Sequence, residues 1–150
     1  MSASRTFVAG LLELRQIPFW IRSVLSSETN LLPSQVSALM MRVELAVQEL
    51  CVNVVTHGYG GRSGQRLELI IQLDARDFSV VVIDDGPEFD PETVAAPDPD
   101  AMQVHGFGVS IISSLTTEFA VARSGGRNRS RLVFAVPPRA EDPAEPEAAR

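Results

Sequence analysis

Residues 49–59 read ELCVNVVTHGY and end the strongest helical pattern in the chain. From Gln35 onward, apolar residues recur at steps of three and four, as on one face of a helix, until the pattern stops before a glycine. Glu49 and Asn53 are four residues apart, so a helix projects both from one face, and His57 continues that line one turn later. This polar stripe beside the apolar one can line a cleft, although an isolated pair of this kind is more often exposed to solvent.

Short strand patterns and helical patterns surround this segment. The predicted strands are 4–10, 66–74, 78–83, 118–122 and 130–136, and the other predicted helices are 11–27, beginning near Pro18, and 109–115. Residues 75–77 and 125–129 are predicted turns, so the strands on either side of each form a hairpin. Because strands and helices do not alternate strictly, we expect an α+β fold, a two-layer sandwich with a mixed, mainly antiparallel sheet and helices on one face.

Length and composition indicate one domain. A chain of 150 residues with 45% hydrophobic composition builds one core, predicted here as residues 1–136. The tail 137–150 is acidic and rich in proline and alanine, and is predicted to be disordered. Cys51, the single cysteine, has no partner for an internal disulfide. With neither a signal peptide pattern nor an apolar run long enough for a membrane span, we expect a cytoplasmic protein without a membrane partner.

The charged residues exclude several functions. The net charge is −6 and no basic cluster is visible, so a nucleic-acid partner is not expected. All 13 basic side chains are arginine, and the sequence has no lysine. P-loop enzymes and eukaryotic-type protein kinases both place a lysine against phosphates, so neither mechanism is available.

Residues 84–91, DDGPEFDP, follow a fully apolar predicted strand. Asp84 therefore stands at the end of a buried strand, and Gly86 lets a ligand approach the backbone. A carboxylate in this position can accept a hydrogen bond from an amine-bearing ring. An ordinary Asp-Gly turn is the alternative interpretation.

Residues 105–112, HGFGVSII, place Gly106 and Gly108 before a short helical pattern. Backbone amides at such a helix start can receive phosphate oxygens without a lysine. A lone Gly-x-Gly is weak by itself. The preceding stretch, 87–104, is rich in proline, aspartate and alanine and contains no arginine, so it is predicted to be a mobile lid.

In this order and spacing the three motifs resemble the N, G1 and G2 boxes of the GHKL ATPase superfamily, which has the Bergerat-type fold. The sequence is most similar to the anti-sigma-factor serine/threonine kinase branch, and the resemblance extends to Val136. It implies binding of ATP and Mg²⁺. Asn53 would ligate the magnesium ion, Glu49 would act as general base or orienting group, and Asp84 would accept from the adenine amine.

The resemblance also implies roles for further residues. Those that would border the adenine are Gly86, Phe89 and Ser130, and those that would close over the phosphates are Gly106, Phe107, Gly108 and Val109. His57 would lie beside the nucleotide or serve a structural role at the helix end.

The function implied by the resemblance is that of a serine/threonine protein kinase in a bacterial partner-switching system. It would phosphorylate a STAS-type antagonist and sequester a sigma factor or another client, as a homodimer. A nucleotide-gated binding module without phosphoryl transfer and a domain that binds no nucleotide are the alternatives. The predicted lid has no basic residue for the terminal phosphate, which bears on catalytic rate more than on binding. Exposed apolar residues near Phe19 and Trp20 are candidates for client recognition.

Overall fold

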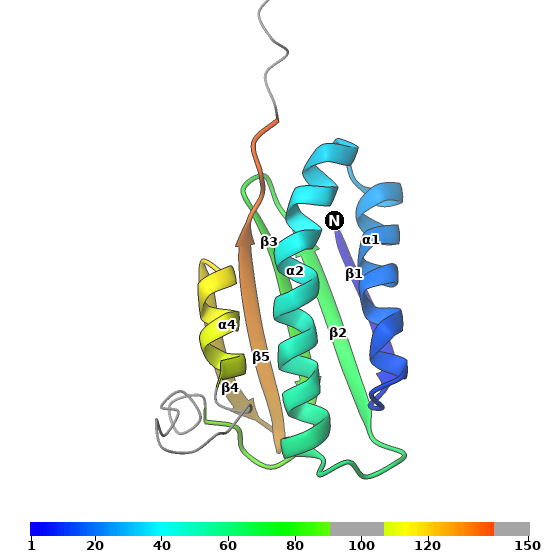
Figure 1. Ribbon diagram of the computed structural model, residues 1–150, viewed down its shortest axis with the longest axis vertical. Coiled ribbons are helices and arrows are strands. Elements are labelled where there is room, and N and C mark those ends of the chain that lie inside the picture. Colours follow the sequence, from blue (N-terminus) through cyan, green and yellow to red (C-terminus); the bar gives the residue numbers. More distant parts are fainter. Residues whose placement is uncertain (91–106, 140–150) are drawn as a thin grey trace, which may run out of the picture.

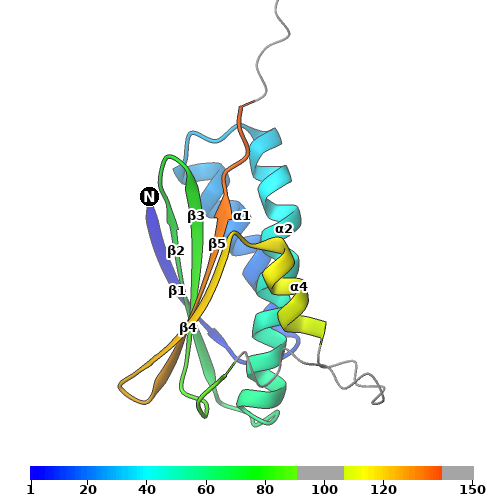
Figure 2. The same cartoon turned by 90° about the vertical axis from the view of Figure 1, so that its left-hand side faces the viewer.

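The computed structural model describes residues 1–90 and 107–139, which form two layers (Figures 1 and 2). Within these residues, five strands form one sheet in the order β1-β2-β3-β5-β4, and each neighbouring pair is antiparallel. The strands are β1 (Ser2–Val8), β2 (Arg66–Leu73), β3 (Asp77–Asp84), β4 (Glu118–Ser124) and β5 (Arg127–Ala135). The helices are α1 (Gln16–Glu28), α2 (Pro33–Asn53) and α4 (Phe107–Leu115), with a 3₁₀ turn η1 (Glu13–Arg15) and a π-helical turn η2 (Val54–Gly58).

The helices α1, α2 and α4 of the described residues cover the same face of the sheet (Figure 2). The predicted α+β two-layer arrangement is therefore confirmed, with a sheet that is wholly antiparallel in the described part of the chain. No helix within residues 1–90 and 107–139 combines the length and apolarity that crossing a membrane requires.

Several element ends differ from the sequence prediction. The strand β1 begins at Ser2 and ends at Val8, so it lies two residues earlier than predicted. Pro18 does not interrupt α1, because it stands in the first turn, where backbone N–H groups have no partner within the helix. At the other end of the domain, α4 begins at Phe107, two residues before the predicted start.

The β4–β5 hairpin turns on two residues, which corrects the predicted five-residue turn. Gly125 and Gly126 have φ of 60° and 75°, the conformation that a type I′ hairpin turn requires at both central positions. Residues 127–129 consequently belong to β5 and pair with β4 across the hairpin. The longer strand places Asn128 directly opposite Asp84 of β3.

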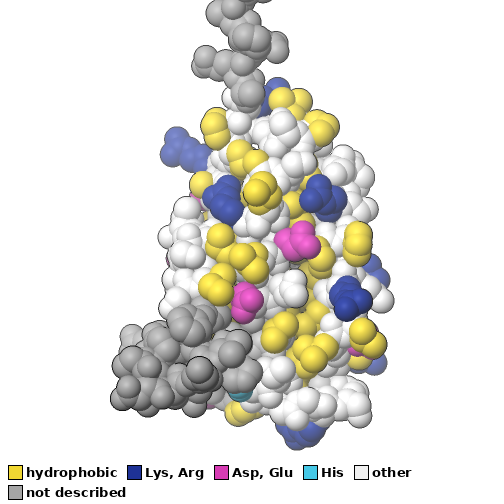
Figure 3. All heavy atoms as spheres, viewed as in Figure 1, with side chains coloured by type: hydrophobic (Ala, Val, Ile, Leu, Met, Phe, Trp, Pro, Cys, Tyr) yellow, Lys and Arg dark blue, Asp and Glu magenta, His cyan; other side chains and the backbone are white. Residues whose placement is uncertain are grey.

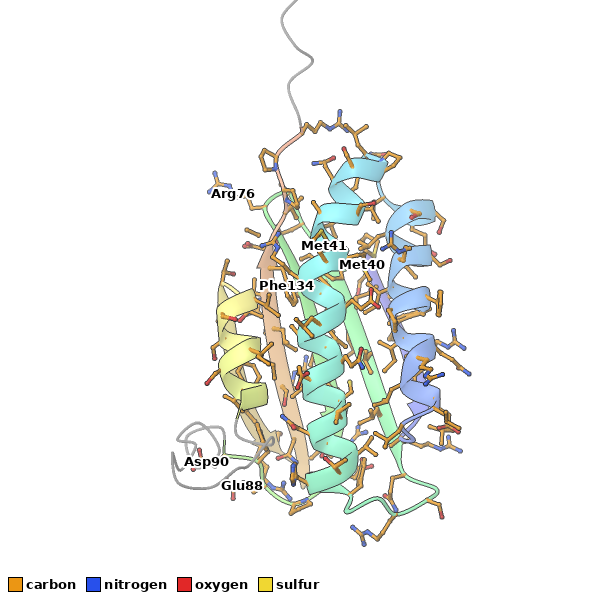
Figure 4. All side chains as sticks on the ribbon, in the orientation of Figure 1. Met40, Met41, Arg76, Glu88, Asp90 and Phe134 are labelled. Carbon is orange, nitrogen blue, oxygen red and sulfur yellow. The ribbon has the colours of Figure 1, made fainter. Side chains whose placement is uncertain are left out.

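The core lies between the sheet and α2. Alternate residues of β3 and β5 face the helices, and the rings of Phe78 and Phe134 lie 6.4 Å apart across the two strands. Phe134 lies on β5 beside α2, which contributes Met40 (Figure 4), and both side chains are fully buried. α4 packs against α2 from the other side, so α2 is held by the sheet and by both neighbouring helices.

The first residues of the predicted tail contact the rest of the protein. Gln35 donates from Nε2 to the carbonyl oxygen of Pro137 at 2.8 Å, and Arg139 donates to the carbonyl oxygen of Asn30 at 3.0 Å. The rest of that tail, 140–150, lies outside the described residues.

Candidate functional site

Asp84 ends β3 with a side chain that is only 2% exposed. Its Oδ1 accepts from the backbone N–H of Gly86 at 2.9 Å and from Nδ2 of Asn128 at 3.0 Å. Both hydrogen bonds that the described residues give to this carboxylate go to Oδ1. The other oxygen, Oδ2, receives no hydrogen bond from the described residues and can accept one from a ligand.

Asn128 fixes the loop that follows Asp84. Its Nδ2 also donates to the carbonyl oxygen of Pro87 at 2.7 Å, and its Oδ1 accepts from the backbone N–H of Phe89 and from Arg123, both at 3.1 Å. The side chain is 1% exposed, so these bonds form away from competing water. No sequence pattern marked Asn128, because the predicted turn covered it.

Replacing Asn128 with alanine is expected to lower the free energy of unfolding by about 2–4 kcal/mol, because it leaves buried partners of Asn128 unsatisfied. Urea unfolding measures this change. The matched control is Arg129→Ala at the next, exposed position of β5, which is expected to change stability by less than about 0.5 kcal/mol. If Asn128→Ala changed the free energy of unfolding as little as Arg129→Ala does, the hydrogen bonds of Asn128 would contribute nothing to stability.

Tyr59 joins the end of α2 to the same loop. Its hydroxyl donates to the carbonyl oxygen of Arg66 at 2.7 Å and accepts from the backbone N–H of Asp85 at 2.8 Å. Burial raises the pKa of the Tyr59 hydroxyl above its ordinary value, so the phenol stays protonated and continues to donate. Tyr59 stands in the first motif, yet nothing in its spacing predicted this role.

The end of α2 and the end of β3 lie against each other. A Cβ atom added at Gly86 would lie 3.5 Å from backbone atoms of Gly58. Burial, and after it the negative charge of Asp84, raise the pKa of the Cys51 thiol to about 12, which places that part of α2 in the field of the carboxylate. The structure thus brings the first two sequence motifs together.

Asn53 carries an unsatisfied polar atom. The side chain is buried, and its Nδ2 has no hydrogen-bond partner in the part of the chain that the structure describes. Leaving a buried amide unpaired costs about 1–3 kcal/mol, so such groups are rare outside sites that bind something. Glu49, one turn earlier on α2, is half-buried. This pair offers a carboxylate and an available amide side by side.

The last turn of α2 widens into a π-helix directly after Asn53. The backbone N–H of Tyr59 donates to the carbonyl oxygen of Val54 at 2.7 Å, five residues back. His57 is exposed, whereas Asn53 is buried, so the four-residue spacing does not continue the polar stripe as predicted. Such π-turns are frequent at functional sites.

The remaining predicted residues lie on β5, on α4, in the loop after β3, or outside the described residues. Ser130 is buried on β5 opposite Val82, on the same face as Asn128, and Phe89 is half-buried. The first turn of α4 contains Phe107, Gly108 and Val109, of which Val109 is buried. Gly106 and residues 91–104 of the predicted lid lie outside the described residues.

The side chains at the site fit a magnesium ion that takes most of its coordinating oxygens from a bound nucleotide and from water. Among the described residues, no cluster of three or more His, Cys, Asp or Glu side chains can hold a metal alone. Mg²⁺ in nucleotide sites takes one or two protein oxygens and completes its shell with phosphate oxygens and water. Asn53 meets this need because rotating its unpaired amide by 180° exchanges the nitrogen and the oxygen.

The described part of this α+β domain has a buried carboxylate at a strand end, an unpaired amide on the facing helix and a glycine-containing helix start. The chain belongs to the histidine kinase-like ATPase domain family, whose model matches residues 7–134. This match confirms the superfamily that the three motifs indicated, and identifies the chain as an ATP-binding domain.

A solved structure shares the fold. The RsbU and RsbW domains of Rv1364c from Mycobacterium tuberculosis align with a TM-score of 0.62 and 18% sequence identity, over 92% of this chain and 33% of that chain. At this identity the likeness shows the fold, and this chain spans about a third of the length of the solved one. A comparison with curated proteins gave no match.

Proposed function

We propose that this protein is a serine/threonine protein kinase of a bacterial partner-switching system. It uses ATP and Mg²⁺ to phosphorylate a STAS-type antagonist and sequesters a sigma factor or another client, as a cytoplasmic homodimer. The observation that carries the proposal is the unpaired buried amide of Asn53, one helical turn from Glu49. The family match and the motif resemblance to the anti-sigma-factor kinase branch support it.

Each residue has one task in the proposed reaction. Oδ2 of Asp84 accepts from the adenine amine, and the first backbone amides of α4 face the phosphates. Glu49 takes the proton of the substrate hydroxyl while the hydroxyl oxygen forms a bond to the γ-phosphorus of ATP. The bond between the γ-phosphorus and the bridging oxygen of the β-phosphate breaks, and ADP leaves. Asn53 would hold a magnesium ion, which when bound would supply positive charge to offset the charge of the phosphates.

Charge explains how phosphorylation would switch partners. A phosphate adds about −1.5 to −2 charges at neutral pH. This protein has a net charge of −6, so the phosphorylated antagonist is repelled from it. Release of the antagonist frees the kinase to bind its client.

The direct test is incubation with labelled ATP, magnesium and a STAS-type antagonist, followed by mass spectrometry of the antagonist. One phosphate on a serine or threonine is the expected result. Nucleotide-dependent binding of the antagonist without any transfer would overturn the kinase assignment.

That second outcome would support a nucleotide-gated binding module. The absence of lysine, and of arginine between residues 87 and 104, favours this alternative, because no basic side chain of that segment meets the terminal phosphate. A binding module would respond equally to ATP and to a non-hydrolysable analogue, whereas a kinase would lose product formation with the analogue.

Gly86→Ala is expected to weaken ATP binding about tenfold, because the new Cβ would lie 2.9 Å from Oδ1 of Asp84 and displace the carboxylate. Isothermal titration calorimetry measures the affinity. Gly58→Ala is the control from the other side of the same contact, since its Cβ would meet only Val54, at 3.7 Å. A similar loss in both variants would mean that contact between the loops, not the carboxylate, sets the affinity.

A further inference from the structure

A groove opens between α1 and α2 on the helical face of the protein. Its volume is about 420 Å³, and residues of η1 and α1 line one side of it and residues of α2 the other. Buried apolar side chains form its floor, namely Leu14, Ile17, Ile21, Val47 and Cys51. None of the residues to which the proposed function assigns a task lines this α1–α2 groove.

An exposed apolar side chain lines the groove on α1, and two more lie on α2 beyond the lining. On α1, Phe19 is 76% exposed. On α2, the half-buried Val52 lines the groove. Met41 (78% exposed) and Leu45 (44% exposed) lie outside the lining, on the same helical face as Val52. Figure 3 shows hydrophobic side chains gathered over α2 and its boundary with α1. Exposed apolar side chains gathered on one face favour a site of interaction.

The sequence drew attention to Phe19 and Trp20 together, and the structure separates them. Trp20 is partly buried and packs edge-on against Phe7, with ring centroids 5.6 Å apart. Phe19 lines the groove and is exposed. Of the two aromatic side chains, only Phe19 is therefore available to a partner.

The charges at the groove are opposite in sign to the charge of the whole chain. Arg15 of η1 and Arg22 of α1 line the groove, and Glu44 lines it from α2. These two positive charges and one negative charge give the lining a net charge of +1, whereas the net charge of the whole chain is −6. Arg15 and Arg22 are seven residues apart, about 10 Å along a helix. Neither takes part in an ion pair among the described residues.

We propose that the α1–α2 groove binds an amphipathic helix of a protein partner. The apolar side chains of that helix, at steps of three and four, insert between Phe19 of α1 and Val52 of α2, over the apolar floor. Two acidic side chains seven residues apart pair with Arg15 and Arg22. A second copy of this chain fits less well, since a two-fold contact would set the basic groove against itself.

This inference goes beyond the kinase function because helix binding here requires no phosphoryl transfer. The test therefore uses the full chain without nucleotide and two labelled synthetic helices of about 20 residues with the same leucine stripe. One helix carries two glutamates seven residues apart, and the other carries lysines at those positions. Fluorescence anisotropy is expected to give a dissociation constant on the order of 10 µM for the glutamate helix and at least about tenfold weaker binding of the lysine helix.

Two variants locate the binding. The double variant Arg15→Glu, Arg22→Glu is expected to reverse the preference, so that the lysine helix binds more tightly. Phe19→Ala is expected to weaken the glutamate helix about tenfold, with little effect on folding because the side chain is exposed. The control is Arg76→Glu in the β2–β3 turn, away from α1 (Figure 4), which should leave both affinities unchanged.

Three results would overturn the inference. Equal affinity for the two helices would show that Arg15 and Arg22 do not select an acidic helix. An unchanged preference in the double variant would show that the helix binds elsewhere on the protein. If Phe19→Ala instead dissociates a dimer in analytical ultracentrifugation and leaves helix binding unaltered, the surface serves self-association. The phosphorylation assay above is read independently, so failure of either proposal leaves the other standing.

Discussion

Glu49→Gln is expected to slow phosphoryl transfer to the antagonist by about 10²–10⁴-fold while ATP affinity changes by less than about twofold. Glutamine preserves the size of the side chain and its hydrogen bonding, but it cannot take the proton of the attacking hydroxyl. Asn53, Asp84 and the start of α4 remain intact in this variant, so the nucleotide keeps its proposed contacts. Single-turnover transfer with labelled ATP measures the rate, and calorimetry measures the affinity.

The control for this variant is Glu28→Gln, which removes one carboxylate from the exposed end of α1 and should leave the rate unchanged. Transfer at the wild-type rate by Glu49→Gln would exclude this carboxylate as the base. A parallel fall in ATP affinity would instead assign Glu49 to binding.

Asp84→Asn is expected to weaken ATP binding about 100-fold and to shift the preference toward inosine triphosphate. The two donors that meet Oδ1, from Gly86 and Asn128, require an acceptor there, so the new amide keeps its oxygen at that position. Its NH₂ group consequently points to the ligand, where it opposes the adenine amine and leaves buried donors unpaired. Inosine presents a carbonyl oxygen at the same place and accepts from it.

Competition between the two nucleotides in equilibrium dialysis measures this preference. Asp85→Asn is the matched control, because Asp85 is exposed and its carboxylate pairs with Arg127 at 2.8 Å. Unchanged selectivity in Asp84→Asn would mean that the base is recognised by another group.

The long helix and the buried strand that ends at Asp84 were predictable because their signals are local. The apolar spacing along α2 and the carboxylate at the end of an apolar strand each follow from the side chains of one short segment. For the same reason, the two-layer α+β class followed from the order of the elements. The all-antiparallel pairing is a property of the assembled sheet, and the sequence left a mixed sheet open.

Asn128 and Tyr59 were missed because their roles depend on contacts between distant segments. Asn128 meets Asp84 only when β5 pairs with β3, 44 residues away in the chain. Adjacent glycines at 125 and 126 were a usable signal for a two-residue hairpin, which would have placed Asn128 in the strand. The π-turn after Asn53 has no counterpart in the apolar spacing, so the exposure of His57 was not predictable.

The same two turns of α2 present Glu49 and Asn53 on one side and Gln48 and Val52 to the α1–α2 groove on another. A displacement of this segment by a molecule at either place would alter the geometry at both. Thermodynamic linkage then makes the effect reciprocal: the factor by which ATP changes the affinity of a helix in the groove equals the factor by which the helix changes the affinity of ATP. Titrating ATP in the presence and absence of the helix therefore gives the coupling factor for both ligands.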